Sequence, residues 1–328
     1  MRVLLVANEP ERAMRLKMFK KTLTKLGYEV HVPIYSSKSW FDVSREVVQH
    51  IKELRPHVVH IFNVPDLLYY KIPSLKGVYF KRLIYDYRSP WDLELRIRFC
   101  RGFDLLGRVC EKRLAKAADV ITAANTPLAE KVRAYNRSAD VYIIPNYPSI
   151  EDFREKEEVL IEKCRPVILF LGKVSVEEGA YGLRRLATAI DDLDIWIVGE
   201  GPELSKIPRK PNVKFFGWQP HKRALAIAEK ADVSVVPRKE TIAMRYYTDK
   251  NLWKINECLN LGVKVIASGI VKEEKRKNLV VTRFDELLKT LRMEILKKPE
   301  PLESRDYRFW EDYCEPVIKR VYEEISSY

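Results

Sequence analysis

KNLWKINECLNLGVKVIAS, residues 250–268, joins a short amphipathic helix to a buried strand. Apolar residues recur at helical spacing as far as Leu261, and Gly262 supplies a C-terminal stop. The run from Val263 to Ala267 has the composition of a buried strand. A helix that begins after a loop presents free backbone amides, which favour a phosphate group. The stretch therefore predicts one helix–strand unit of an α/β sheet, with a seat for an anion.

The same alternation of strand and helix patterns recurs along the whole chain. We expect strands at 3–6, 30–32, 58–62, 83–85, 120–123, 141–144, 167–171, 195–198, 213–216, 233–236, 263–267 and 279–282. Helices are expected at 10–26, 42–54, 92–117, 126–136, 178–190, 220–230, 251–261 and 284–295. Such alternation predicts an α/β protein with two doubly wound parallel sheets.

A domain boundary is expected in the charged segment 145–166, which prolines bracket. We therefore expect a first Rossmann-like domain over 1–147 and a second domain over 148–304. The last segment, 305–328, has a helical pattern and is expected to pack back on the first domain. Its apolar stripe comprises Trp310, Tyr313, Val317, Ile318, Val321 and Tyr322.

Length and composition narrow the class of protein. A chain of 328 residues is long enough for two domains. No run approaches the ~20 apolar residues that a membrane span needs, and the N-terminus lacks the pattern of a signal peptide. The five cysteines show no metal-ligand spacing, which fits a reducing cytoplasm and predicts no metal site.

The formal net charge of +13 is unevenly distributed. Residues 1–150 hold 26 Lys and Arg against 15 Asp and Glu, a net charge of +11, which leaves +2 for the rest. This asymmetry indicates a polyanionic partner, namely nucleic acid, an anionic membrane or a phosphorylated acceptor. Nucleic acid is disfavoured because no binding motif accompanies the charge. An alternative is thermophile-like enrichment in charged residues, which accounts for the charge content but not for its asymmetry.

Two basic amphipathic stretches lie in the first half, at 10–26 and 95–117. The first mixes basic and apolar residues that include Arg12, Arg15, Lys17, Lys20, Lys21 and Lys25 with Met14, Leu16, Met18, Phe19, Leu23 and Leu26. The second mixes Arg96, Arg98, Arg101, Arg108, Lys112 and Arg113 with Phe99, Phe103, Leu105 and Leu106. Basic helices with exposed aromatic residues suit an anionic membrane interface. The alternative is that the apolar residues pack in the core and the charges are solvated.

Five short motifs follow one another in the second half: FLGK at 170–173 with EG at 178–179, IVGEGP at 197–202, FFGW at 215–218, ADVSVVP at 231–237, and Lys254-x-x-Glu257 ahead of GVKVIAS. In this order the sequence resembles the family 4 glycosyltransferases, which are retaining enzymes of the GT-B fold. The resemblance implies two Rossmann-like domains that face each other across a cleft.

The resemblance also implies a site for a nucleotide sugar in the second domain. Glu257 would bind the ribose hydroxyls, and Lys173 and Lys254 would bind the diphosphate. Asp249 would contact the donor sugar and is a candidate catalytic residue. The other residues expected at this site are Gly172, Gly201, Pro202, Trp218, Arg238 and Lys250. Without the resemblance, Lys254 and Glu257 would be interpreted as a surface ion pair and Asp249 as a helix N-cap.

One position departs from the family pattern. Glu178 stands where the family has a lysine that binds the diphosphate. A carboxylate would repel a diphosphate, so Lys250, Arg238 or Lys239 would have to supply the missing charge. Otherwise the nucleotide site is weak, altered or absent.

In the first domain, Asp86-x-Arg88-x-x-Trp91 follows a predicted strand. The carboxyl ends of parallel strands are where open α/β sheets bind ligands. Asp86 and Arg88 are therefore candidate catalytic residues, although an ion pair between the two is an equal alternative. Asn8, His60 and Trp91 are expected on the acceptor side, although a lone histidine at a strand end is more often structural.

The resemblance implies a metal-independent, retaining hexosyltransferase. It would move a hexose from a nucleoside diphosphate sugar, with no cofactor beyond this co-substrate, to a glycan, lipid-linked or phosphorylated acceptor. We expect it in the cytoplasm, with peripheral attachment to the inner face of the membrane. The alternatives are a catalytically weak or inactive binding protein of the same fold and, less favoured, a nucleotide-sugar 2-epimerase.

Overall fold

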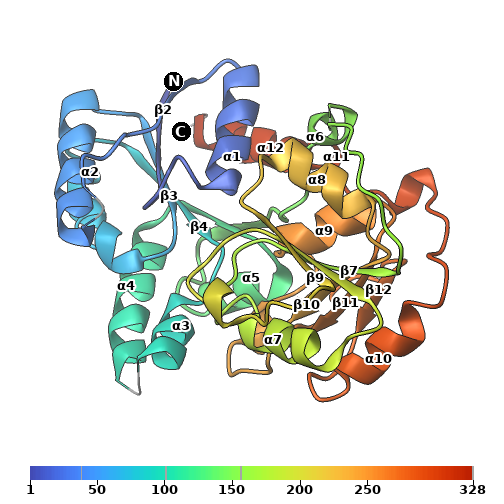
Figure 1. Ribbon diagram of the computed structural model, residues 1–328. Coiled ribbons are helices and arrows are strands. Elements are labelled where there is room, and N and C mark those ends of the chain that lie inside the picture. Colours follow the sequence, from blue (N-terminus) through green and yellow to red (C-terminus); the bar gives the residue numbers. More distant parts are fainter. Residues whose placement is uncertain (38, 100–101, 156, 327–328) are drawn as a thin grey trace. The chain divides into compact units, whose positions relative to one another are not determined.

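The computed structural model describes residues 1–328 except 38, 100–101, 156 and 327–328. The chain divides into two units, which we describe separately. The first unit comprises Met1–Asn146 and Glu311–Tyr328, and the second comprises Tyr147–Trp310. In the described residues, each unit is built around a six-stranded parallel sheet (Figure 1).

The sheet of the first unit has the strand order β2-β1-β3-β4-β5-β6. Its strands are β1 (Arg2–Val6), β2 (Glu29–His31), β3 (Val58–Phe62), β4 (Arg82–Tyr87), β5 (Val120–Ala123) and β6 (Asp140–Ile143). The helices between them are α1 (Met14–Lys25), α2 (Trp40–Leu54), α3 (Trp91–Arg98), α4 (Phe103–Ala117) and α5 (Thr126–Arg133). Short 3₁₀ helices at Asp66–Tyr69 and Ile72–Leu75 connect β3 to β4.

The sheet of the second unit has the order β12-β11-β10-β7-β8-β9. Its strands are β7 (Val167–Leu171), β8 (Asp194–Val198), β9 (Val213–Gly217), β10 (Val233–Pro237), β11 (Lys264–Ser268) and β12 (Leu279–Val281). The helices are α6 (Ile150–Arg154), α7 (Ala180–Ala189), α8 (His221–Glu229), α9 (Trp253–Asn260) and α10 (Leu287–Glu294).

Both faces of the second sheet are covered by helices (Figure 1). Along β7, Leu169 packs into the apolar cluster formed with α8 and α9, and its neighbour Phe170 packs into the cluster formed with α7 and α10. Successive side chains of a strand point to opposite faces. A strand buried on both faces therefore appears in the sequence as one continuous apolar run, VILFL.

The order of strands creates a topological switch point in the second sheet. From β7 the chain moves outward to β8 and β9, and then returns to the other side of β7 with β10. Open α/β sheets bind ligands at the carboxyl ends of the strands beside such a point. The ends of β7 and β10 are therefore where a ligand site is expected.

The predicted fold class, with two doubly wound parallel sheets, is confirmed. The prediction of one continuous helix over 92–117 was wrong, because α3 ends at Arg98 and α4 begins at Phe103. Gly102 has a φ of +108°, which a helix does not allow. Cys100 and Arg101, which belonged to that predicted helix, lie outside the described residues.

The C-terminal segment is also broken into two helices, α11 (Trp310–Tyr313) and α12 (Glu315–Ser326). Pro316 lies in the first turn of α12, where a proline is tolerated. Because proline has no backbone N–H to donate, the preceding helix α11 cannot continue through it. Helix α12 packs on α1 and β6 of the first unit, where Ile318, Val321 and Tyr322 are buried. Residues 327–328 of the predicted helix lie outside the described residues.

Within the described part of the chain, no helix combines the length and the apolar character needed to cross a membrane.

Candidate functional site

We call the ends of β7, β8 and β10 together with the start of α9 the switch edge (residues 172–179, 199–202, 237–239 and 249–257). Its loops pack backbone against backbone. A Cβ atom on Gly199 would lie 2.0 Å from the carbonyl oxygen of Gly172, and one on Gly201 would lie 2.2 Å from that of Val174. Neither position can carry a side chain without moving the loops apart. The predicted site residues Gly172 and Gly201 thus belong to one tightly packed layer of loops, the floor of the switch edge, and the predicted Pro202 follows Gly201 as an exposed residue.

Lys254 and Glu178 form an ion pair above this floor. The Nζ atom of Lys254 lies 2.7 Å from Oε2 of Glu178 and 5.1 Å from the ring centroid of Phe170. Their side chains are 12% and 29% exposed. Burial would raise the pKa of Glu178, but the positive charges of Lys254 and Arg238 outweigh it and lower this pKa to about 2. Glu178 is therefore ionised and bound to the lysine that the resemblance places on phosphate.

Arg238 follows β10 at the switch point and is only 7% exposed. Its guanidinium lies 3.9 Å from the ring centroid of Tyr247. Its Nη1 atom is buried and has no hydrogen-bond partner among the described residues. A buried donor without a partner is costly, so this atom is available for an anionic ligand. Lys173 is exposed beside Gly172, and its charge also lowers the pKa of Glu178.

Glu257 lies one turn beyond Lys254 and contacts a histidine that the sequence did not single out. Its Oε1 atom lies 2.8 Å from Nε2 of His221, the first residue of α8, and Nδ1 of His221 lies 3.6 Å from Asp152. Burial would lower the pKa of His221, but hydrogen bonds to Asp152 and Glu257 and their charges raise it to about 10. His221 is thus an imidazolium held between two carboxylates.

The alternative of a surface ion pair between Lys254 and Glu257 was wrong, because each side chain has a partner elsewhere. The helix N-cap is Leu252, so the N-cap interpretation of Asp249 was wrong as well. Asp249 is fully buried, and its Oδ1 accepts a 2.6 Å hydrogen bond from the amide of Glu273. Its Oδ2 is buried and has no partner among the described residues. Burial raises the pKa of this carboxyl group.

Two of the three cations considered as replacements for the missing lysine are engaged elsewhere. Nζ of Lys250 lies 3.0 Å from Glu273 and 3.4 Å from Glu274. Nζ of Lys239 lies 3.7 Å from the ring centroid of Tyr181. Arg238 is the member of this group whose buried nitrogen lacks a partner in the described structure.

Trp218 lies just after β9 and is 69% exposed. Its backbone amide donates a 3.3 Å hydrogen bond to Oε1 of Glu200, in the loop after β8. Because Trp218 follows the carboxyl end of β9, its exposed indole lies at the same edge of the sheet as the switch edge.

In the first unit, the alternative of an ion pair between Asp86 and Arg88 was wrong. Asp86 is fully buried and makes a bidentate ion pair with Arg15, with both N–O distances 2.7 Å. It also accepts a hydrogen bond from Thr122. Burial would raise the pKa of Asp86, but Arg15 outweighs it and lowers this pKa. Arg88 instead donates to the carbonyl oxygen of Asn63. The sequence did not distinguish Arg15 on α1 from the other basic residues of that helix, whose charges could all be solvated.

The residues expected on the acceptor side are not brought together at a surface. His60 is fully buried, packs on Phe19 and lies 2.8 Å from the Tyr322 hydroxyl. Burial lowers its pKa to about 3, so it is neutral. Trp91 is buried in a small apolar cluster. Of the three, Asn8 is the one with appreciable exposed surface.

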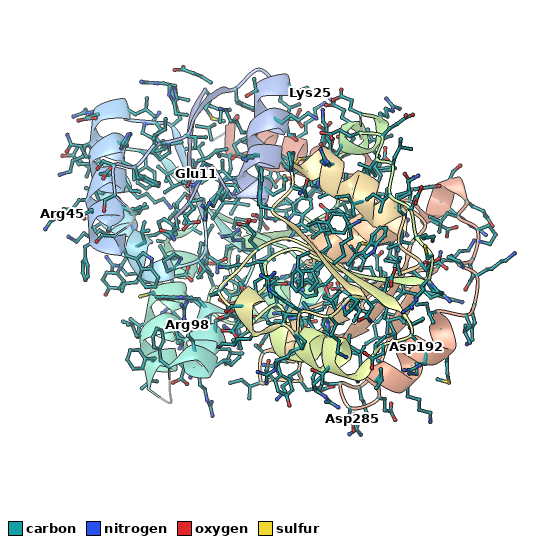
Figure 2. The ribbon with its side chains drawn as sticks, in the orientation of Figure 1. Glu11, Lys25, Arg45, Arg98, Asp192 and Asp285 are labelled. Atoms are coloured by element: carbon teal, nitrogen blue, oxygen red, sulfur yellow. The ribbon has the colours of Figure 1, made fainter. Side chains whose placement is uncertain are left out.

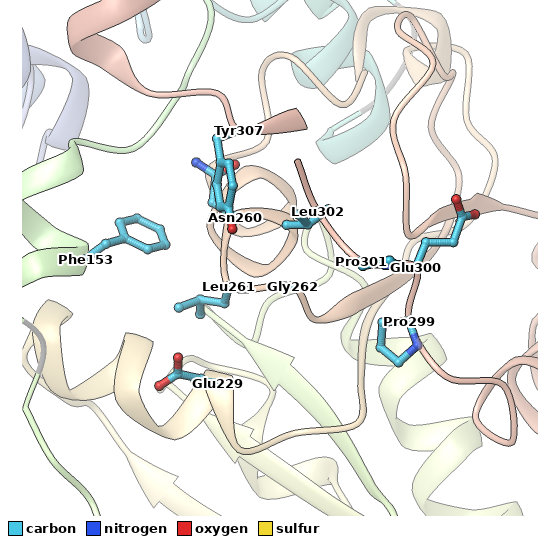
Figure 3. A pocket seen from close by; sticks show the side chains of 10 residues that line it. All are labelled: Phe153, Glu229, Asn260, Leu261, Gly262, Pro299, Glu300, Pro301, Leu302 and Tyr307. Carbon is cyan, nitrogen blue, oxygen red and sulfur yellow. The ribbon is translucent and has the colours of Figure 1, made fainter. Parts of the chain in front are cut away.

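The second unit also contains a pocket, whose lining side chains are shown in Figure 3. Its walls include Asn260–Gly262, which precede β11, and Glu229 at the end of α8. Both segments lie at the amino ends of strands, away from the switch edge. Within the described residues, no cluster of His, Cys, Asp and Glu is suited to a metal ion. We therefore take the switch edge as the candidate site.

Comparison with solved structures reveals the same fold over the whole chain. The chain matches sucrose-phosphate synthase from Thermosynechococcus elongatus with a TM-score of 0.74 and 14% identity over 99% of both chains. It matches HepE from Anabaena, solved with UDP and glucose, with a TM-score of 0.69 and 12% identity over 100% of both chains. At such identities the similarity shows the fold, which is the two-domain Rossmann-like GT-B fold.

The same comparison includes an enzyme of another class. The chain matches UDP-GlcNAc 2-epimerase from Methanocaldococcus jannaschii with a TM-score of 0.57 and 12% identity over 100% of this chain and 99% of that one. No protein-family model matches the chain, and no curated protein matches it.

Proposed function

We propose that the chain is a glycosyltransferase that binds a nucleoside diphosphate sugar at the switch edge. The observation that carries this proposal is the charge at the switch point. Lys254 pairs with Glu178 at 2.7 Å, and the charges of Arg238 and Lys173 also lower the pKa of Glu178. The three positive charges and the one negative charge sum to +2. A nucleoside diphosphate sugar carries two negative charges on its diphosphate, so the site and the ligand are complementary.

Arg238 takes the role that a lysine at position 178 would otherwise have. Its Nη1 atom is buried and has no hydrogen-bond partner among the described residues. The backbone of Arg238 packs against Gly179, where a Cβ atom would lie 3.1 Å from the amide nitrogen of Arg238. The free amides at the start of α9 add donors on the same side. The diphosphate becomes more negative as the glycosidic bond breaks, and cations placed in advance stabilise that charge.

The rest of the nucleotide sugar fits the neighbouring side chains. The carboxylate of Glu257 is fixed by His221, which leaves its second oxygen for the ribose hydroxyls. Trp218 offers an exposed face for stacking of the base. The buried Oδ2 of Asp249 is an acceptor for a sugar hydroxyl. We propose transfer of a hexose with retention of configuration to a glycan, lipid-linked or phosphorylated acceptor in the cytoplasm. With three cations on the diphosphate, we expect no metal requirement.

A binding protein without turnover is the second candidate, because the Glu178–Lys254 pair places a negative charge at the phosphate site. A 2-epimerase is less well supported, because its chemistry needs acid–base residues. His221, the histidine at this site, has a pKa of about 10 and is a poor base at neutral pH.

The two main candidates are separated by measuring nucleotide release. The chain is incubated with UDP-glucose, GDP-mannose and ADP-glucose, and free nucleoside diphosphate is followed with water as the acceptor. Release from one sugar nucleotide, lost in Arg238→Gln and retained in the exposed control Arg245→Gln, supports a transferase. Binding of a nucleotide sugar without any release supports the binding protein.

A further inference from the structure

An apolar surface lies at the turn between α3 and α4 in the first unit. We call it the α3–α4 tip. Its members are large apolar side chains that are between 43% and 61% exposed: Ile97, Phe99, Phe103, Leu105, Leu106 and Val109. The ring centroids of Phe99 and Phe103 lie 5.2 Å apart across the turn. So many exposed large apolar side chains on one helix–turn–helix segment are uncommon on a protein surface and mark an interaction site.

The tip stands on a rigid base. Gly107 packs so closely on α3 that a Cβ atom there would lie 2.6 Å from Cα of Asp92. Lys131 on α5 pairs with Asp92 at 2.5 Å and with Glu111 at 2.8 Å, and both acids are buried. Trp91, together with Leu95 and Cys110, fills the small core between the helices. The apolar residues of the tip are therefore held outward by a well-packed helical hairpin.

The tip is also basic. Between Leu95 and Arg113 the sequence holds six basic and two acidic residues, a net charge of +4, and one of the two acids, Glu111, is buried. Arg98 lies at the exposed end of α3 (Figure 2), with its guanidinium 5.8 Å from the ring centroid of Phe99. Apolar side chains surrounded by cations are complementary to a surface that is apolar inside and anionic outside.

The other basic stretch of the first half differs in this respect. On α1 the apolar side chains of Leu16, Phe19 and Leu23 are fully buried in the core. The expectation of exposed aromatic residues was therefore wrong for α1, which is an ordinary amphipathic helix with its apolar face in the core. It holds for Phe99 and Phe103 at the α3–α4 tip.

We infer that the α3–α4 tip docks on an anionic membrane surface. Its apolar side chains enter the interface while Arg96, Arg98 and Lys112 contact lipid phosphate groups. A second copy of this chain fits less well, because it would place two surfaces of net charge +4 against each other. This inference does not depend on the nucleotide site, which lies in the other unit.

The test uses the full chain and sedimented vesicles of phosphatidylcholine alone or with about 30 mol % phosphatidylglycerol. We expect binding to the anionic vesicles and little binding to the neutral ones. Replacing Phe103→Ser and Leu106→Ser together should reduce the partition coefficient at least about tenfold. Arg98→Glu, which changes the charge by two, should also reduce it by about tenfold or more, and added salt should weaken binding of the unaltered chain.

Matched controls separate the tip from general effects. Leu296→Ser removes an apolar side chain in the second unit that is more exposed than either tip residue, at 81% against 45% for Phe103 and 43% for Leu106. Lys20→Glu makes the same charge change as Arg98→Glu, but on α1. Both should bind vesicles like the unaltered chain. The inference is overturned if the unaltered chain does not bind anionic vesicles, or if Lys20→Glu weakens binding as much as Arg98→Glu does. A third outcome is that the chain binds no vesicles but dimerises with rising concentration in ultracentrifugation, and that the Phe103 and Leu106 changes abolish the dimer. This outcome would assign the tip to self-association instead.

Discussion

Nζ of Lys254 and Oε2 of Glu178 lie 2.7 Å apart, on elements separated by 76 residues of chain. Lys254 is the residue that the family resemblance places on a diphosphate, and Glu178 stands where the same resemblance would place a second lysine. In this pair, the Glu178 carboxylate occupies the position next to Lys254 that a phosphate group of a ligand would otherwise take. Under the proposed function, a diphosphate would compete with Glu178 for Lys254, and Arg238 would supply the remaining charge.

Glu178→Gln should increase the affinity for nucleoside diphosphates. The substitution keeps the shape of the side chain but removes the charge that repels phosphate and occupies Lys254. We expect a gain of about tenfold, since like charges near a protein surface repel by roughly 1–4 kcal/mol. Isothermal titration calorimetry measures it, with the exposed neighbour Glu177→Gln as the control. An unchanged or lower affinity in Glu178→Gln would show that Glu178 does not oppose the ligand.

Arg238→Gln should have the opposite effect on affinity. Loss of the buried guanidinium removes one of the cations facing the diphosphate, so affinity should fall at least about tenfold. The melting temperature without ligand should fall only modestly, because the substitution loses the contact with the Tyr247 ring but no hydrogen bond of Nη1, which has no partner among the described residues. A large loss of stability together with unchanged affinity would identify Arg238 as a structural residue only.

His221 predicts a pH dependence of stability. Its pKa is raised from the usual 6.5 to about 10 in the folded state. The stabilisation is therefore fully present below about pH 6.5 and is lost as the pH rises toward 10. Because the side chain is 27% exposed, we expect a loss on the order of 2 kcal/mol. Urea unfolding of the unaltered chain and His221→Gln at about pH 6 and about pH 9.5 measures it.

The expected result is a difference between the two chains at the lower pH that shrinks at the higher pH. His31→Gln, which removes a more exposed histidine paired with Glu29, is the control and should show a much smaller difference. A constant difference between the unaltered chain and His221→Gln across this range would contradict the imidazolium assignment.

Asp86→Asn should destabilise the first unit. The substitution leaves Arg15 buried with an uncompensated charge, and breaking one partner of such a pair costs about 3–5 kcal/mol. Chemical denaturation measures it against Asp42→Asn, which breaks an exposed pair on α2 that is worth about 0–1 kcal/mol. Equal effects of the two substitutions would contradict a structural role for Asp86.

The sequence predicts local structure well where the pattern that defines a strand, helix or turn lies within one short segment. The run VILFL, the stop at Gly262 and the alternation of elements are properties of neighbouring residues, and the structure has strands and helices there. The break between α3 and α4 was missed because a single glycine in a helical pattern is often tolerated.

The partners of charged residues could not be predicted in the same way. Arg15 and Asp86 are 71 residues apart and Glu257 and His221 are 36 apart, and no local pattern links them. Arg15 differs from the other basic residues of α1 only in the face of the helix it occupies. A histidine at the first position of α8 is a weak signal, and its importance comes from two carboxylates on other elements.

The central claim is that the switch edge binds a nucleoside diphosphate, and thermal stabilisation by UDP, GDP and ADP and their sugar conjugates tests it most directly. A ligand at 100-fold over its dissociation constant should add about 2.7 kcal/mol of stability. The account predicts stabilisation by one nucleotide, larger in Glu178→Gln and lost in Glu257→Ala. Absence of any shift, in both the unaltered chain and Glu178→Gln, would contradict the account.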